Sequence, residues 1–213
     1  MRSSGNLELR MSYACNNLCR FCREGDARER VPDMSVDAAL KLLKRKRAEC
    51  CGLVISGGEP TLIDSLPDIV RAAKDDFGYE DVRIETNARR AAYKKYARMI
   101  AASGADRFVV SIHGHCAPLH DYLTCRPGSF AETVLGIRNL LDAGAAVETR
   151  TVITRPSVYS LADIAAFIAA AGVEKTAFVF PAAAGCAAAN VFAVVPFISV
   201  AARHAEEIGR AHV

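Results

Sequence analysis

The sequence alternates short apolar segments with longer amphipathic segments along most of its length. Short apolar runs predict buried strands, and the longer segments, several of them closed by glycine, predict helices. Strands that alternate with helices favour a parallel sheet built from right-handed β-α-β units. The predicted strands span Leu7–Tyr13, Leu53–Ser56, Val82–Asn87, Arg107–His113, Ala145–Ile153 and Thr176–Phe180.

Helices are predicted between these strands. Ser35 is a suitable N-cap for the first helix, and Gly144 and Gly172 follow the ends of two others. The 213 residues, of which 51% are hydrophobic and 24% charged, suit one globular domain with a sizeable core. The predicted helices span Val36–Glu49, Ser65–Phe77, Ala91–Ser103, Phe130–Ala143 and Leu161–Ala171.

No Gly-x-Gly-x-x-Gly motif follows the first strand, which disfavours a dinucleotide-binding doubly wound sheet. The α/β pattern instead predicts a partial (β/α)6 TIM-like barrel, in which chemistry occurs at the carboxyl ends of the strands. Acidic and basic residues on the inner face predict either a polar lumen that binds a polar ligand or a set of internal salt bridges. The polar residues expected on that face are Glu8, Arg10, Ser12, Arg83, Glu85, Asn87, Ser111, His113, Glu148 and Arg150.

Three cysteines, Cys15, Cys19 and Cys22, follow the first strand in a C-x-x-x-C-x-x-C spacing. Three thiolates within eight residues can bind one soft metal centre, such as an iron-sulfur cluster, zinc or Cu(I). A structural zinc site or an ordinary cubane cluster normally has four protein ligands. The spacing therefore predicts either a fourth ligand from elsewhere or a coordination position left open for chemistry.

The segment Gly57-Gly58-Glu59-Pro60-Thr61 comes directly after the second strand. The glycines allow the backbone to approach a ligand and to adopt positive φ. Pro60 favours an extended Glu59 whose amide and carbonyl are available. We expect this turn and the cysteine loop to lie at the same edge of the sheet, because both follow parallel strands.

Composition narrows the possible partners and location. No apolar signal region opens the chain and no stretch is long enough to span a membrane, so we expect a reducing cytoplasm, where clustered cysteines bind metals. The net charge of +3 does not indicate a nucleic-acid partner. The basic run from Lys41 to Arg47 is interpreted as a solvated helix face, with an acidic partner as the alternative. The five scattered cysteines, interpreted as buried or idle thiols, are Cys50, Cys51, Cys116, Cys125 and Cys186.

The two motifs together resemble those of the radical S-adenosylmethionine (radical SAM) enzymes. Members of that superfamily have a C-x-x-x-C-x-aromatic-C loop after the first strand and a Gly-Gly-Glu-Pro segment after the second, and Phe21 occupies the aromatic position here. The resemblance covers nearly the whole chain. It implies an enzyme built on a six-unit partial β/α barrel.

The resemblance also implies a role for each matching residue. Cys15, Cys19 and Cys22 would be the catalytic metal ligands that hold three irons of a [4Fe-4S] cluster, and the amino and carboxylate groups of S-adenosylmethionine would chelate the fourth iron. Reductive cleavage of S-adenosylmethionine would give a 5'-deoxyadenosyl radical that abstracts hydrogen from a substrate. The implied cofactor-binding residues are Phe21 near adenine, Gly57, Gly58 and Glu59 at the methionine amino group, and Thr86, Asn87, Ser111 and Arg150 at the ribose and carboxylate.

The partner implied for such an enzyme is a reducing electron donor of the flavodoxin or ferredoxin type. The substrate stays open between a peptide or protein and a small molecule of cofactor biosynthesis. The competing hypothesis is a non-catalytic zinc or iron-sulfur module that takes Cys50, Cys51 or a histidine as its fourth ligand. Because Cys50 and Cys51 precede the second strand, we expect them on the opposite rim from the loop.

A second polar cluster, His113-Gly114-His115-Cys116 followed by His120-Asp121, comes after the fourth strand. It resembles a Ser-x-His/Asp-Gly segment of radical SAM peptide and cofactor maturases, which is followed there by His-Asp and Arg-Pro-Gly-Ser-Phe. His113 could contact the substrate or S-adenosylmethionine. For His115 and His120, hydrogen bonds within the loop are favoured over a second metal site.

The end of the chain departs from the maturase pattern. Only Cys186 follows Cys125, so the extra cysteines that bind auxiliary clusters in such relatives are not expected here. Residues 207–213 match the translation of a common sequencing-adapter read. We therefore expect residues 1–206 to be the core domain, residues 207–213 to be a non-native tail, and the natural protein to continue.

Overall fold

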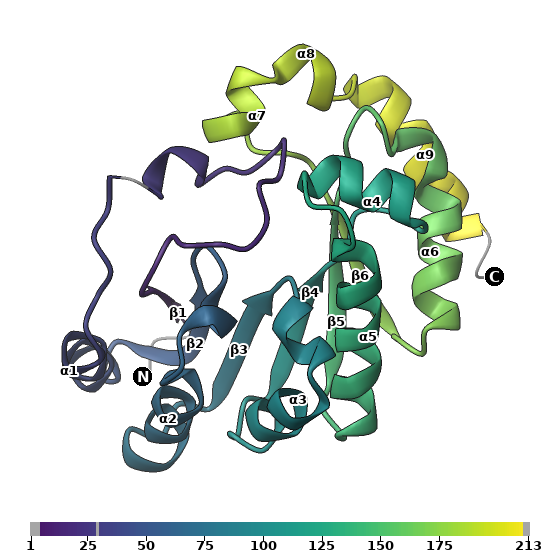
Figure 1. Cartoon of the computed structure of the whole chain (residues 1–213). Coiled ribbons are helices and arrows are strands. Elements are labelled where there is room, and N and C mark those ends of the chain that lie inside the picture. The colour runs from purple at the N-terminus through teal and green to yellow at the C-terminus, as the bar shows by residue number, and fades with distance from the viewer. Residues whose placement is uncertain (1–4, 29, 211–213) are drawn as a thin grey trace.

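A computed structural model, which describes residues 5–28 and 30–210, contains one parallel sheet with its strands in the order β1 to β6 (Figure 1). In this part of the chain β1 and β6 are the edge strands and do not pair with each other, so the barrel is open. The predicted α/β fold, a partial (β/α)6 barrel, is confirmed. The strands are β1 (Gly5–Arg10), β2 (Cys50–Ser56), β3 (Asp81–Thr86), β4 (Arg107–Ser111), β5 (Val147–Val152) and β6 (Lys175–Val179).

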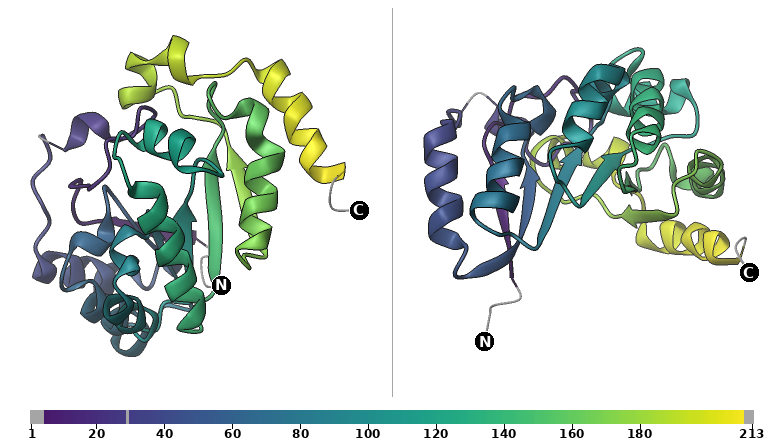
Figure 2. Two further views of the ribbon diagram at one scale, coloured as in Figure 1. Left: turned by 45° about the vertical axis from the view of Figure 1, so that its right-hand side comes forward. Right: turned by 90° about the horizontal axis from the view of Figure 1, so that it is seen from below.

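Helices between consecutive strands cover the outer face of the sheet (Figure 2). The Ser35 hydroxyl accepts a hydrogen bond from the Ala38 amide, which confirms the predicted N-cap. The helix after β3 begins later than predicted because Ala88 has a φ of 58° and a 3-10 turn, Arg89–Ala92, follows it. The helices are α1 (Val36–Lys46), α2 (Leu66–Arg71, continued by a π-helix over Ala72–Asp76), α3 (Lys94–Ala101), α5 (Ser129–Asp142) and α6 (Leu161–Ala170).

Further helices that the sequence did not predict lie beyond the carboxyl ends of the strands or beside α6 (Figures 1 and 2). Two of them have only five and four residues, which is too short for a helical period to be visible in the sequence. These helices are α4 (Ala117–Thr124), α7 (Gly185–Ala189), α8 (Val191–Val194) and α9 (Ile198–Arg210).

The last helix includes the first residues of the predicted non-native tail. Ile208 packs against a small apolar cluster that contains Leu161 and Ala201. Whether residues 207–213 belong to the natural protein stays a prediction, and residues 211–213 lie outside the described residues.

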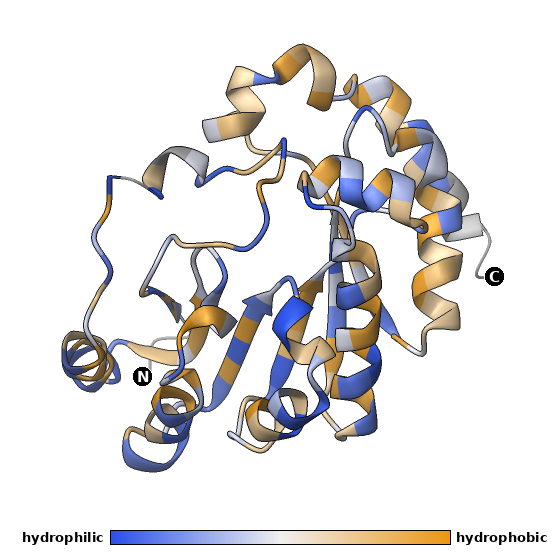
Figure 3. Cartoon of the chain, viewed as in Figure 1, coloured by the Kyte–Doolittle hydropathy of each residue, from blue (hydrophilic) through white to orange (hydrophobic). Residues whose placement is uncertain are grey.

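The two faces of the strands differ as the alternation predicts. Val82, Ile84 and Thr86 of β3 are buried, whereas Arg83 and Glu85 on the other face are only partly buried. Figure 3 shows this alternation as bands of opposite hydropathy along the strands. The apolar face packs on the helices and forms the core, which leaves the concave face polar.

Ion pairs cross the concave face between neighbouring strands. Arg150 lies 2.8 Å from Glu85, and Arg107 lies 2.6 Å from Asp81 and 3.5 Å from Glu148. All five side chains are between a quarter and a third exposed, so the pairs contribute little to stability. They confirm that the inner face is polar, and they are the internal salt bridges that the sequence analysis gave as one of its two alternatives.

The parallel register aligns the carboxyl ends of the strands at one rim. Ser56 pairs with Arg10, and Ser111 pairs with Arg150. Cys50 and Cys51 begin β2, so they lie at the opposite end of the sheet from the segment that follows Arg10. No helix in residues 5–28 and 30–210 is both long and apolar enough to cross a membrane.

Candidate functional site

A cavity of about 310 Å³ opens at the carboxyl ends of β1 to β6. The cysteine loop forms one wall, and the turns after β2 and β3 form another. His113, which follows β4, also lines the cavity. The predicted site residues that line it are Cys15, Cys19, Phe21, Cys22, Gly57, Gly58, Glu59, Thr86, Asn87 and Ser111.

Arg150 is the predicted cofactor-binding residue that does not line this cavity. Its guanidinium is held by the ion pair with Glu85 on the concave face. Its role toward a cofactor carboxylate therefore has no support from the geometry.

The three predicted cysteine ligands face the shared cavity. The sulfur of Cys15 accepts a hydrogen bond from the Asn17 amide at 3.4 Å, and the sulfur of Cys22 lies 3.9 Å from an Arg28 guanidinium nitrogen. Burial raises the pKa of Cys15 and of Cys19, so thiolates here need a metal to stabilise them. In the described part of the chain, no three His, Cys, Asp or Glu side chains are arranged to hold a single metal ion. The thiols line a common space and do not converge on one point.

The two glycines after β2 are required by close packing on the segment that leads into the cysteine loop. A Cβ at Gly57 would lie 2.4 Å from the Ser12 carbonyl oxygen, and one at Gly58 would lie 2.2 Å from that of Ala14. The Gly58 and Glu59 amides donate hydrogen bonds to these same two oxygens at 2.9 Å and 2.8 Å. Glu59 is extended, as predicted, but its amide is not available to a ligand. That part of the prediction is wrong because the turn extends the pairing of β1 with β2.

The Glu59 side chain is only 2% exposed and forms the most connected polar centre of the site. Its carboxylate accepts hydrogen bonds from the Thr61 amide and hydroxyl, from the Thr86 hydroxyl at 2.5 Å, and from the Asn87 amide at 2.7 Å. Burial raises its pKa although these donors oppose the change. The carboxylate thus joins the turn after β2 to the end of β3.

Asn87 and Arg89 connect the end of β3 to the first half of the cysteine loop. The side-chain amide of Asn87, through Nδ2, donates to the side-chain oxygen of Asn16 at 2.6 Å. Arg89 donates to the Asn16 carbonyl at 2.5 Å and to the Asn17 side chain at 2.9 Å, and Glu132 of α5 pairs with the same guanidinium. Asn87, which was predicted as a cofactor-binding residue, therefore positions the cysteine loop.

The middle of the loop is attached to α4. The amides of Leu18 and Arg20 donate to the carbonyls of Thr124 and Leu123 at 2.9 Å and 3.0 Å. These carbonyls lie at the end of α4, where no intrahelical partner is available to them. The unpredicted helix α4 is thus part of the site's support.

The end of the loop is covered by α7. The Cys186 amide donates to the Cys22 carbonyl at 2.8 Å. Gly185 has a φ of 51°, and a Cβ there would lie 2.4 Å and 2.6 Å from the carbonyl oxygens of Arg23 and Cys22. This approach requires glycine.

Phe21 and His113 contact each other at the cavity wall, with ring centroids 4.6 Å apart in an edge-to-face arrangement. The His113 ring nitrogen Nδ1 accepts from the Val152 amide at 3.3 Å, so the proton of the neutral ring lies on Nε2. Burial, with His120 nearby, keeps the pKa of His113 well below its usual value. His113 is therefore a neutral hydrogen-bond donor in the cavity wall.

His120 and Asp121 have structural roles, as predicted for His120. His120 Nδ1 accepts from the His113 amide at 3.2 Å. Asp121 caps α5 by accepting from Gly128, Ser129 and Phe130. Burial opposes its ionisation, but these hydrogen bonds outweigh that effect and lower its pKa.

Several cavity residues were missed by sequence reasoning. Ser56, Glu85 and Val152 lie at or near the ends of predicted strands, and Glu85 was expected only on the polar inner face. The others lie in or beside loops with no recognisable period, where the proximity of residues 23–28 to Cys22 was the available signal. The missed residues are Tyr13, Asn17, Arg23, Glu24, Arg28, Ser56, Glu85, Val152, Phe180, Pro181 and Ala182.

Residues 9–168 match the family model described as the Radical SAM superfamily. The chain belongs to the radical SAM superfamily. The predicted family is therefore confirmed, and the match includes the cysteine loop and the Gly57-Gly58-Glu59 turn.

Two curated radical SAM relatives are similar in sequence. A probable GTP 3',8-cyclase from Saccharolobus solfataricus is 30% identical over 65% of this chain and 44% of its own length. An AdoMet-dependent heme synthase from Nitratidesulfovibrio vulgaris is 29% identical over 72% of this chain and 42% of its own length. The chain spans less than half the length of either relative.

Solved structures share the fold. Streptococcus suis SuiB bound to the precursor peptide SuiA superimposes with a TM-score of 0.79 and 16% identity over 99% of this chain and 46% of SuiB. Native anSMEcpe with bound AdoMet and a peptide gives a TM-score of 0.71 and 15% identity over 83% of this chain and 51% of that one. At these identities the likeness concerns the fold alone.

Replacing Gly185 by alanine tests the cover that α7 provides to the radical SAM cysteine loop. The added Cβ meets two backbone carbonyls of the loop, so we expect Gly185→Ala to lower the free energy of unfolding by about 1–3 kcal/mol more than a matched control. The control is Gly144→Ala, which also has positive φ but has open space around its Cβ. Urea denaturation measures both, and equal losses would contradict the close packing.

Acidification should destabilise the fold through His120. Burial lowers its pKa to about 4, against an unfolded value of about 6.5, so the unfolded state binds a proton first as the pH falls. The stability that neutral His120 contributes is fully present above pH 6.5. It is lost between pH 6.5 and pH 4, and the total loss is on the order of 3 kcal/mol. The free energy of unfolding is measured by urea denaturation of the wild type and His120→Asn at pH 7, 6, 5 and 4. It should depend less on pH in the variant. If the free energy of unfolding fell equally with pH in the wild type and the variant, the assignment of this loss to His120 would be contradicted.

Proposed function

We propose that the chain binds a [4Fe-4S] cluster and S-adenosylmethionine and forms a 5'-deoxyadenosyl radical that abstracts hydrogen from a substrate. The observation that carries the proposal is the shared cavity, where three thiols face the turn after β2. Thiol donors suit an iron-sulfur cluster. When bound, the cluster and cofactor would supply one electron and the cleavage of the carbon-sulfur bond that yields methionine and the radical.

The protein residues would hold and orient these groups. Cys15, Cys19 and Cys22 would be the ligands of three irons. Because the Gly58 and Glu59 amides already donate to Ser12 and Ala14 in the segment after β1, the carbonyl oxygens of the turn are the groups that could accept a hydrogen bond from the methionine amino group. The Glu59 carboxylate, with four hydrogen-bond donors around it, would act as support for the turn.

The remaining cavity residues suit the nucleoside part of the cofactor. Phe21 offers an apolar ring edge, and His113 offers a neutral Nε2 donor beside it. Ser111 and Thr86 lie toward the ribose region in this proposal. The Thr86 hydroxyl already donates to Glu59, so Ser111 is the better candidate for a direct contact.

Two substrate classes follow from the similarities. The curated relatives are named for GTP cyclisation and heme synthesis, which favours a small molecule. The solved structures of SuiB and anSMEcpe hold peptides, which favours a peptide or protein. The charged cavity residues Arg23, Glu24 and Arg28 would face either kind of substrate. The electron donor would be a flavodoxin or ferredoxin, and the reducing cytoplasm is the compartment that fits this chemistry.

Anaerobic reconstitution with iron and sulfide, followed by dithionite and S-adenosylmethionine, tests this function. We expect 5'-deoxyadenosine from the wild type and a loss of at least about tenfold, with loss of cluster absorbance, for Cys19→Ser. Cys51→Ser, at the opposite rim, is the control and should retain both. Stoichiometric zinc with no 5'-deoxyadenosine, or a cluster lost in Cys51→Ser, would instead support the non-catalytic metal module.

A further inference from the structure

The outer surface of the cysteine loop combines exposed apolar and basic side chains. Leu18 and Tyr122 are 47% and 46% exposed, although both belong to segments that are fixed by backbone hydrogen bonds. The Arg20 guanidinium lies 4.2 Å from the centre of the Tyr122 ring, and the exposed Arg126 donates to the Asn16 carbonyl. We call the surface formed by Leu18, Arg20, Tyr122 and Arg126 the loop face.

The loop face includes a shallow hollow of about 400 Å³ beside Arg20, Tyr122 and Cys125. The acidic side chain in this hollow is Asp121, whose carboxylate accepts three hydrogen bonds from the start of α5. Its carboxylate is therefore held at the start of α5, and the two arginines of the loop face outnumber this one negative charge. Arginine and tyrosine are the residue types enriched at protein interfaces.

The adjacent segment adds no opposing charge. The Asn190 side chain donates to the Arg20 carbonyl at 3.3 Å, which places the end of α7 next to the loop face. The helices α7 and α8 contain no acidic or basic residue in their sequences. These two helices therefore add apolar surface and no opposing charge beside the loop face.

We propose that the loop face docks an acidic one-electron donor protein. This inference rests on the proposed function, which requires one electron to reach a cluster held by Cys15, Cys19 and Cys22. Those cysteines line the inner side of the same loop, so a donor on its outer side is separated from them by the loop and the end of α4. In the transfer the donor group is oxidised by one electron and the cluster is reduced by one electron, and no atom moves between the proteins.

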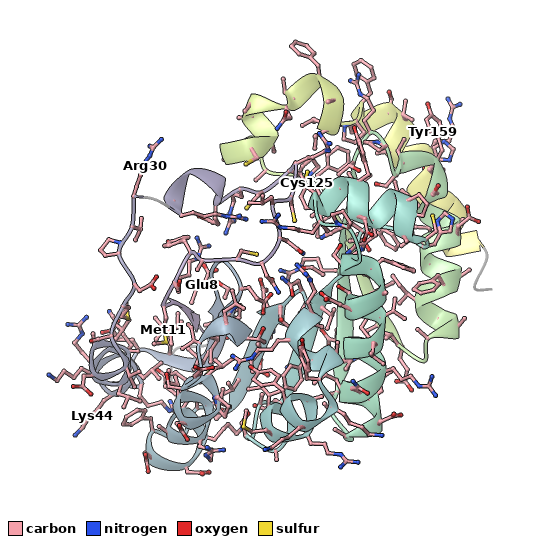
Figure 4. The ribbon with its side chains drawn as sticks, viewed as in Figure 1. Glu8, Met11, Arg30, Lys44, Cys125 and Tyr159 are labelled. Carbon is pink, nitrogen blue, oxygen red and sulfur yellow. The ribbon has the colours of Figure 1, made fainter. Side chains whose placement is uncertain are left out.

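Another basic surface exists, and it is the competing docking place. Lys41, Lys44 and Arg45 of α1 are exposed. In Figure 4 Lys44 lies far from Cys125, which marks the loop face. The start of α1, at Ser35 and Val36, lies beside Ala14, whereas Lys44 and Arg45 lie in the last turn of the helix. A donor at these two residues would therefore be separated from the cysteine loop by the length of α1, so charge alone does not make α1 suitable.

The test compares charge-removing variants at the two surfaces with two reductants. The loop-face variant is Arg20→Gln with Arg126→Gln, and the matched control is Lys44→Gln with Arg45→Gln, because each removes two positive charges. The rate of cluster reduction is measured from the loss of visible absorbance. One series uses dithionite as the reductant, and the other uses a reduced bacterial flavodoxin. A third variant, Arg20→Lys with Arg126→Lys, keeps the charge and removes the guanidinium hydrogen bonds.

With flavodoxin at low salt we expect the loop-face variant to be slower by roughly tenfold, because electrostatic attraction raises association rates. Rates for the control and the lysine variant should stay within about twofold of the wild type, as should every rate with dithionite. Added salt should slow the wild type with flavodoxin and reduce the difference.

Equal flavodoxin rates in the wild type and the loop-face variant would overturn the docking site, as would a loss confined to the α1 control. A dithionite rate lowered in the loop-face variant to the same extent would show damage to the site and would also overturn it. Failure of the proposed function is distinguishable, because the reconstituted wild type would then form no 5'-deoxyadenosine even with dithionite.

Discussion

The buried carboxylate of Glu59 is the interaction on which the arrangement of the site depends. A carboxylate that is 2% exposed is costly unless donors surround it, and here the donors come from the turn after β2 and from the end of β3. Leaving one of these donors unpaired would cost about 1–3 kcal/mol. The carboxylate therefore fixes two neighbouring strand ends in one geometry, and Asn87 carries that geometry to the cysteine loop through Asn16.

The cysteine loop has little regular structure of its own, so its shape comes from its neighbours. Asn87 and Arg89 hold its first half, the end of α4 holds its middle, and Gly185 and Cys186 hold its end. The contacts come from three directions and from distant parts of the chain. A loop supported in this way can present three thiols to one cavity before any cluster binds, which limits the ordering that binding requires.

Much of the fold followed from local sequence signals. The order of the predicted strands and helices, the polar inner face and the Ser35 cap all depend on periodicity or on one capping residue, and each was confirmed. The cysteine loop and the Gly57-Gly58 turn were placed at the same rim because both directly follow parallel strands. The contacts that support the site could not be predicted in this way, because Asn87 and Asn16 are 71 residues apart and α7 is only five residues long. The free amide expected at Glu59 was wrong for a similar reason, since its acceptor on Ala14 depends on how two strands pair.

The central claim is that Cys15, Cys19 and Cys22 leave one iron of a cluster open for S-adenosylmethionine. Electron paramagnetic resonance of the anaerobically reconstituted and reduced protein, recorded without and with the cofactor, tests it most directly. We expect the signal of one reduced [4Fe-4S] cluster, and we expect this signal to change when S-adenosylmethionine is added, because the cofactor would bind iron. A cluster signal that is the same with and without saturating cofactor would contradict it.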